Sequence, residues 1–161
     1  MADIEAKLQA LGYVLPAPMI LPPGDALPFP WVRVHGSRAF ISGHGPLNAD
    51  GSVAEPRGKV GKDLTAEQAH VAARQVGLAI LASLKRELGD LDRVSSWLRV
   101  LGMVNAAPGF HRMPYVINGF THLILELYGP VRGAHARSAV GMAELPFEIP
   151  VEIEGEVEIR P

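Results

Sequence analysis

Residues 151–159, near the end of the chain, alternate between acidic residues and apolar residues or glycine. The apolar positions are Val151, Ile153, Val157 and Ile159, and the acidic ones are Glu152, Glu154, Glu156 and Glu158. Because successive side chains of a β-strand point to opposite faces, the segment predicts a strand with one buried face and one acidic face. A row of like charges is unfavourable unless water or partner groups offset it. The chain is therefore expected to fold around a sheet that is buried on one face only.

Two helical segments are long enough to cover the buried face. Residues 65–88 repeat apolar side chains at helical spacing, Thr65 and Gln68 form a capping box, and Gly89 is a stop signal. Residues 114–128 have the same periodicity and are followed by Gly129-Pro130. Shorter apolar stretches predict further strands at residues 31–35, 38–42, 93–104 and 137–143. This order predicts an α+β fold, with one sheet and two long helices on one of its faces.

The first 30 residues have a different character. Residues 4–11 predict a short helix, and residues 15–30 contain six prolines, too many for a helix or an inner strand. Apolar residues interrupt the prolines, so we expect an ordered loop packed on the domain or on another subunit rather than a plain connector. We therefore divide the chain into an extension, residues 1–30, and a domain, residues 31–161.

Composition excludes several classes of function. The chain has no cysteine, so disulfides and thiolate chemistry are impossible, and a net charge of −2 argues against a general nucleic-acid binder. The N-terminus lacks the features of a secretory signal and the apolar runs are too short to span a membrane, so a cytoplasmic protein is expected. The six histidines lack metal-site spacing, and no metal is expected. His44 and His135 could reach a pocket, although a structural or solvent role is favoured for each.

An arginine stands at the start of the preceding predicted strand. Arg137 opens residues 137–143, which connect to residues 151–159 through Leu145-Pro146. On two neighbouring C-terminal strands, Arg137 can pair across the ladder with a glutamate as a structural ion pair. The alternative is a small-molecule pocket in which Arg137 binds a carboxylate and a glutamate activates water. The residues alone leave both roles open.

The C-terminal segment resembles a known family. Arg137-Ser138-Ala139-Val140-Gly141-Met142-Ala143-Glu144-Leu145-Pro146, followed by Pro150-Val151-Glu152-Ile153-Glu154, is similar to the signature of the RidA/YjgF family. Phe40-Ile41-Ser42-Gly43 resembles that family's early strand, which ends in Ser-Gly. The resemblance covers about residues 31–159. An N-terminal extension occurs in the longer branch, which is labelled endoribonuclease-like or chorismate-mutase-like.

The resemblance implies a chorismate-mutase-like (YjgF-type) mixed sheet and a homotrimer with sites between subunits. In such a site Arg137 would bind a substrate carboxylate and Glu152 would deprotonate or orient the attacking water. Ala139 would present backbone polar groups to the ligand. Asn118 would match the asparagine of the second helix, and Ser42 and Gly43 would line the site. Phe29-Pro30-Trp31 stands where the family has Gly-Pro-Tyr, so that the indole of Trp31 replaces a phenol.

The function that the resemblance implies is hydrolytic deamination. The substrate would be a reactive enamine or imine that carries a carboxylate, the products would be a 2-oxo acid and ammonia, and no cofactor would be needed. The alternative is a trimer that binds a carboxylate metabolite without turnover. RNA cleavage is a distant third, because an acidic strand face would repel a polyanion.

Overall fold

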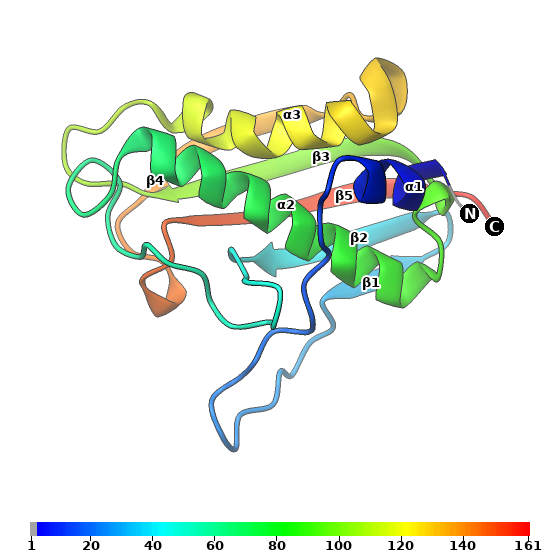
Figure 1. Cartoon of the computed structure of the whole chain (residues 1–161), viewed down its shortest axis with the longest axis horizontal. Helices are drawn as coiled ribbons and strands as arrows, with labels where there is room; N and C mark the ends of the chain where they lie inside the picture. Colours follow the sequence, from blue (N-terminus) through cyan, green and yellow to red (C-terminus); the bar gives the residue numbers. More distant parts are fainter. Residues whose placement is uncertain (1–2) are drawn as a thin grey trace.

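The computed structural model describes residues 3–161, which form a five-stranded mixed sheet in the order β1-β2-β5-β3-β4 (Figure 1). All neighbouring pairs are antiparallel except β3 and β4, which are parallel. The strands are β1 (Val32–His35), β2 (Arg38–His44), β3 (Val94–Asn105), β4 (Ala136–Met142) and β5 (Val151–Ile159).

Two long helices, α2 (Ala66–Leu88) and α3 (Met113–Arg132), lie side by side over one face of the sheet (Figure 1). Helix α3 is also the crossover that joins β3 to the parallel strand β4. The prediction of an α+β fold, with one mixed sheet and two long helices on one of its faces, is confirmed. No helix among residues 3–161 is long and apolar enough to cross a membrane.

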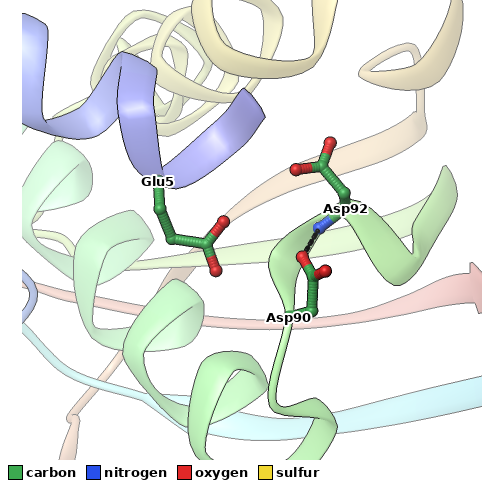
Figure 2. Close-up of side chains that lie close together, drawn as sticks. All are labelled: Glu5, Asp90 and Asp92. Atoms are coloured by element: carbon green, nitrogen blue, oxygen red, sulfur yellow. Dashed lines mark hydrogen bonds between the residues drawn. The ribbon is translucent and has the colours of Figure 1, made fainter. Parts of the chain in front are cut away.

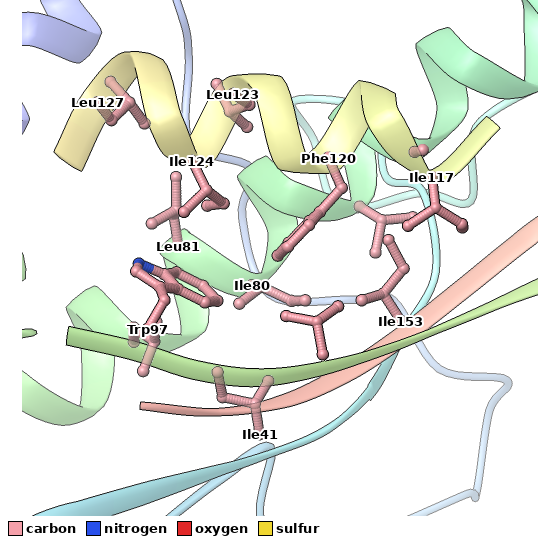
Figure 3. Close-up of a cluster of buried hydrophobic side chains, with 14 of the residues drawn as sticks. Ile41, Ile80, Leu81, Trp97, Ile117, Phe120, Leu123, Ile124, Leu127 and Ile153 are labelled. Atoms are coloured by element: carbon pink, nitrogen blue, oxygen red, sulfur yellow. The ribbon is translucent and has the colours of Figure 1, made fainter. Parts of the chain in front are cut away.

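The core lies between these helices and the sheet (Figure 3). The apolar side chains of β5 point into it, and Val151, Ile153 and Val157 are fully buried. Trp97 of β3 and Phe120 of α3 meet edge to face, with ring centroids 5.6 Å apart, in a geometry that aromatic pairs favour. As predicted, the alternation of residues 151–159 gives β5 one buried and one uncovered face.

On the uncovered face, two of the four β5 glutamates have polar partners. Arg38 Nη1 lies 2.8 Å from Glu156 Oε1, and the Ser95 hydroxyl donates to Glu158 at 3.1 Å. Within residues 3–161, Glu152 and Glu154 accept no side-chain hydrogen bond of this kind. The two glutamates nearer the start of β5 therefore have no countercharge among residues 3–161.

The strand order corrects one expectation. Arg137 and Glu152 do not lie on neighbouring strands, because β3 lies between β4 and β5. The crossover through α3 adds β4 to the outer edge of β3, whereas β5 inserts between β2 and β3. Arg137 stands opposite Val100 of β3, so it cannot pair across a ladder with a glutamate of β5.

Local signals placed the ends of the helices well. The capping box of Thr65 and Gln68 is present at the start of α2, and Gly89 ends that helix in the left-handed conformation. In α3, Gly129 breaks the regular helix with a φ of 76°, as predicted, but a further turn continues to Arg132. Strand β2 runs to His44, two residues beyond the end of the strand predicted at residues 38–42.

Helix α1 (Asp3–Ala10) is fastened to the body of the protein by carboxylates (Figure 2). Glu5 accepts hydrogen bonds from Lys85 Nζ at 2.6 Å and from the backbone of Leu91 at 3.2 Å. Asp92 accepts from the backbone of Ile4 at 3.1 Å, and Asp90 accepts from the backbone of Asp92 at 2.8 Å. The three carboxylates approach within 4.8 Å of one another, and these donors account for their clustering.

Candidate functional site

Glu152 lies at the start of β5 on the uncovered face of the sheet, directly over Gly43 of β2. A β-carbon at position 43 would overlap the carboxylate oxygen of Glu152. Glycine at this position leaves the room in which the carboxylate approaches the backbone so closely. The Ser-Gly motif of β2 and the first glutamate of β5 are parts of one arrangement.

The Glu152 carboxylate faces an apolar cavity of about 150 Å³. It is half-buried, and none of the described residues donates a hydrogen bond to it. Burial raises the pKa of Glu152, and the neighbouring charge of Glu154 raises it further. A carboxylate with a raised pKa and no partner is suited to accept a proton from water.

Two more predicted residues lie at the same end of the sheet. Trp31 lines the cavity that Glu152 faces. Ser42 supports Trp31, because its backbone N–H donates to the Trp31 carbonyl at 3.0 Å and its hydroxyl donates to the Pro30 carbonyl at 2.8 Å. We call Trp31, Ser42, Gly43 and Glu152 the glutamate half-site.

The other predicted residues gather on the helix-covered face, at the edge strand β4. Arg137 Nη1 donates to Asn118 Oδ1 at 2.8 Å and to Thr121 Oγ1 at 3.0 Å, and Nη2 donates to the Pro114 carbonyl at 3.3 Å. Ala139 lies two residues further on the same face, opposite Gly102. We call Arg137, Asn118 and Ala139 the arginine half-site.

The arginine half-site is suited to hold an anion. A guanidinium has five N–H donors, and described residues occupy three of those of Arg137, which leaves two for a ligand. Burial lowers the pKa of Arg137, although a guanidinium remains charged. The contacts from α3 fix its plane, and a fixed plane favours bidentate binding of a carboxylate.

Thr121 and His135, which the sequence did not single out for this role, hold Arg137 in place. His135 Nδ1 lies 2.7 Å from the Gly133 carbonyl, and Nε2 lies 3.0 Å from the Thr121 hydroxyl. Burial lowers the pKa of His135, so the neutral ring donates from Nδ1 and accepts the Thr121 proton at Nε2. The Thr121 oxygen is then free to accept from Arg137. The spacing of three residues between Asn118 and Thr121, one helical turn, is the signal that could have revealed this pair.

The two half-sites do not meet within one chain. Arg137 stands opposite Val100 of β3 and Glu152 stands opposite Met103, on the other face of the sheet. Two inter-strand spacings of about 4.8 Å and three residues of about 3.3 Å place their Cα atoms about 14 Å apart. A site that contains both residues requires a second chain.

His44 has a structural role instead of facing the cavity. It is buried, its Nδ1 donates to the Ser42 carbonyl at 2.6 Å, and its Nε2 accepts from the Ser83 hydroxyl at 2.9 Å. The ring also packs on Trp31, with centroids 4.8 Å apart. Burial lowers the pKa of His44 to about 4, and the charge of Arg86 acts in the same direction. His44 therefore supports the glutamate half-site from behind as a neutral ring.

This assignment predicts a stability that depends on pH. The unfolded chain takes up a proton at His44 below about pH 6.5, and the folded chain does so only near pH 4, so acid favours unfolding across that interval. His44 alone should lower the free energy of unfolding by about 3 kcal/mol between these limits. Urea denaturation at several pH values should give a shallower pH dependence for His44→Gln than for the wild type. His122→Gln, at an exposed histidine of α3, should keep the wild-type slope, and equal slopes for all three proteins would contradict the assignment.

Comparison with known proteins supports a family relationship. No family model matches the chain. Protein TCP17 of Trypanosoma cruzi is 36% identical over 157 residues, which cover 98% of this chain and 94% of that protein. The solved structure of Atu1372, a protein of unknown function from Agrobacterium tumefaciens, is also 36% identical and superimposes with a TM-score of 0.86 over 98% of this chain and 94% of its own.

Other solved structures extend this comparison. A protein from Shewanella oneidensis that carries an endoribonuclease name is 26% identical, with a TM-score of 0.86, over 98% of this chain and 99% of its own. YyfA from Yersinia pestis, described as a protein of unknown function of the conserved Rid family, is 20% identical. It shares the fold with a TM-score of 0.60 over 85% of this chain and 92% of its own.

Proposed function

The chain belongs to the RidA/YjgF family, and on that basis we propose that it hydrolyses carboxylate-bearing imines and enamines to 2-oxo acids and ammonia. The observation that carries the proposal is the environment of Glu152. Its carboxylate is half-buried beside an apolar cavity, it has no partner among the described residues, and its pKa is raised. Such a group is poised to activate water next to an electrophilic carbon.

We propose further that the active site forms between subunits of a homotrimer, with Arg137 of one chain beside Glu152 of the next. Two features support this arrangement. The half-sites lie too far apart to act together in one chain. The uncovered face of the sheet also carries large apolar side chains that are more than a third exposed, and a second copy of the chain is a natural cover for them. These side chains are Phe40, Val140 and Met142.

The reaction follows from these positions. The guanidinium of Arg137 binds the substrate carboxylate, which directs the imine carbon toward the glutamate half-site. Glu152 takes a proton from water as the water oxygen attacks the carbon of the protonated imine, and the C=N electrons move to nitrogen, which becomes a neutral amine. Glu152 then returns the proton to the amine nitrogen. The C–N bond breaks, the hydroxyl oxygen forms the C=O bond of the 2-oxo acid, and its proton leaves through Glu152 to solvent with release of ammonia.

The first test measures how substitutions of Glu152 and Arg137 change the hydrolysis of a single substrate. An L-amino-acid oxidase acting on 2-aminobutyrate generates 2-iminobutyrate, whose disappearance can be followed. We expect Glu152→Gln to lower kcat/KM at least about 100-fold, because it removes the base. Arg137→Lys should act mainly through a higher KM, because an ammonium cannot bind a carboxylate bidentately.

Glu158→Gln is the matched control. It makes the same change on the same strand, at a glutamate hydrogen-bonded to Ser95, and should leave the rate unchanged. An inactive wild-type protein would contradict the proposed activity and leave binding without turnover as the function of the pocket. Full activity of Glu152→Gln would contradict the role of the glutamate.

The pH dependence of the reaction gives a second test. The base acts only when ionised, so kcat/KM should fall as the pH drops through the raised pKa of Glu152. Glu154→Gln removes a like charge and should lower that pKa, which shifts the acid limb of the profile to lower pH. Glu158→Gln should leave the limb in place. An acid limb that stays fixed in Glu154→Gln would show that another group controls the reaction.

A further inference from the structure

The cavity beside Glu152 has a wall that the N-terminal extension supplies. Of the residues that line it within the described chain, Glu152 is the one that carries a charge, and the rest are apolar residues, glycines and prolines. The extension contributes the side chains of Met19, Leu21, Leu27 and Phe29. A concave apolar site with one polar group at its base is the form that small-molecule pockets take.

This wall is held in place by backbone contacts. The N–H of Ala17 donates to the Ala49 carbonyl at 2.9 Å, and the N–H of Ile20 donates to the Gly51 carbonyl at 3.0 Å. The Pro18 carbonyl packs so closely on Gly51 that a β-carbon there would overlap it. Figure 1 shows the extension projecting away from the sheet before it returns to β1. These contacts fix residues 17–20 of the extension against residues 49–51, so the extension forms an ordered wall of the cavity.

The opposite wall contains strained backbone. Phe147 and Glu148 have φ values of 57° and 58°, in the left-handed region that residues other than glycine rarely adopt. The N–H of Gly58 donates to the Glu148 carbonyl at 2.7 Å and holds the turn. The phenyl ring of Phe147 lines the cavity and is about half exposed. Strain of this kind persists where surrounding contacts hold it, and it is often found at ligand sites.

We propose that this cavity is a side-chain pocket, and that the preferred substrates are imines with an aromatic or branched aliphatic side chain. An apolar cavity of about 150 Å³ is large enough for benzene, and this one has that volume. The side chain of 2-iminobutyrate, an ethyl group, would leave most of it empty. The assignment rests on the proposed imine hydrolysis, because that reaction places the imine carbon at Glu152 and so directs the side chain into the cavity.

The chemistry of such substrates identifies the kind of reaction that must supply them. An imine that keeps an intact benzyl or isobutyl group has lost two hydrogens across the Cα–N bond of an amino acid. Elimination of a leaving group from the β-carbon would instead give an enamine, and that route needs no oxidation. The preceding step is therefore an amino-acid oxidation in which a flavin or nicotinamide of another enzyme takes the two electrons.

The test compares substrates of different size in one assay. An L-amino-acid oxidase generates the imines of phenylalanine, leucine and 2-aminobutyrate in place, and initial rates give kcat/KM for each. We expect the wild type to prefer the two larger imines at least about tenfold, since each buried methylene contributes at least this much. Val53→Phe fills the cavity from the loop that follows β2, and Leu27→Trp fills it from the extension. Each should reduce activity on the larger imines at least tenfold more than activity on 2-iminobutyrate.

Val131→Phe is the control, because it makes the same change at a valine that is 84% exposed and distant from the cavity, and it should keep the wild-type preference. Equal rates on all three imines, or equal losses on all three in both filled variants, would overturn the inference and leave the proposed function standing. If no imine is hydrolysed, calorimetric titration with 4-methyl-2-oxopentanoate and pyruvate tests the pocket alone. At least tenfold tighter binding of the branched acid, lost in Leu27→Trp, would support the pocket, and equal affinities would overturn it.

Discussion

The structure depends on β5 pairing with strands on both sides. Because β5 is antiparallel to β2 and to β3, it lies inside the sheet, and its apolar face packs against α2, while α3 packs on β3 and β4. The same pairing displaces β4 to the edge and brings Glu152 over Gly43. A slip of β5 by one residue would turn its apolar side chains to the uncovered face and its glutamates into the core. Burial of the apolar face therefore also fixes the position of the acidic face. The position of the candidate base thus follows from the packing of the core.

The two half-sites differ in how their charges are accommodated. Asn118, Thr121 and the Pro114 carbonyl surround Arg137, so its charge is partly compensated before any ligand binds. The charge of Glu152 has no such compensation within the described chain, and its pKa rises. The arginine half-site can hold an anion and the glutamate half-site can accept a proton, but neither can do both. In the proposed trimer, assembly would be a condition for catalysis as well as a source of stability.

Much of the fold could be predicted from local patterns. The alternation of β5, the capping box at Thr65 and the apolar periodicity of α3 each act within a few residues, and each was confirmed. Strand order could not be predicted this way, because pairing joins residues far apart in the chain and periodicity does not encode partners. The separation of Arg137 from Glu152 followed from that order. A bulge between Ile41 and His44 likewise moved His44 into the strand and the core.

The central claim is that Arg137 and Glu152 of different chains form one site. It can be tested by mixing two inactive variants, Arg137→Ala and Glu152→Gln, after unfolding and joint refolding. In a closed trimer, each mixed assembly has one interface with both native residues, so an equal mixture restores about a quarter of the wild-type sites. We predict that imine hydrolysis returns to about that fraction, while each variant refolded alone stays inactive. A mixture as inactive as its components, with trimers formed, would contradict a site shared between chains.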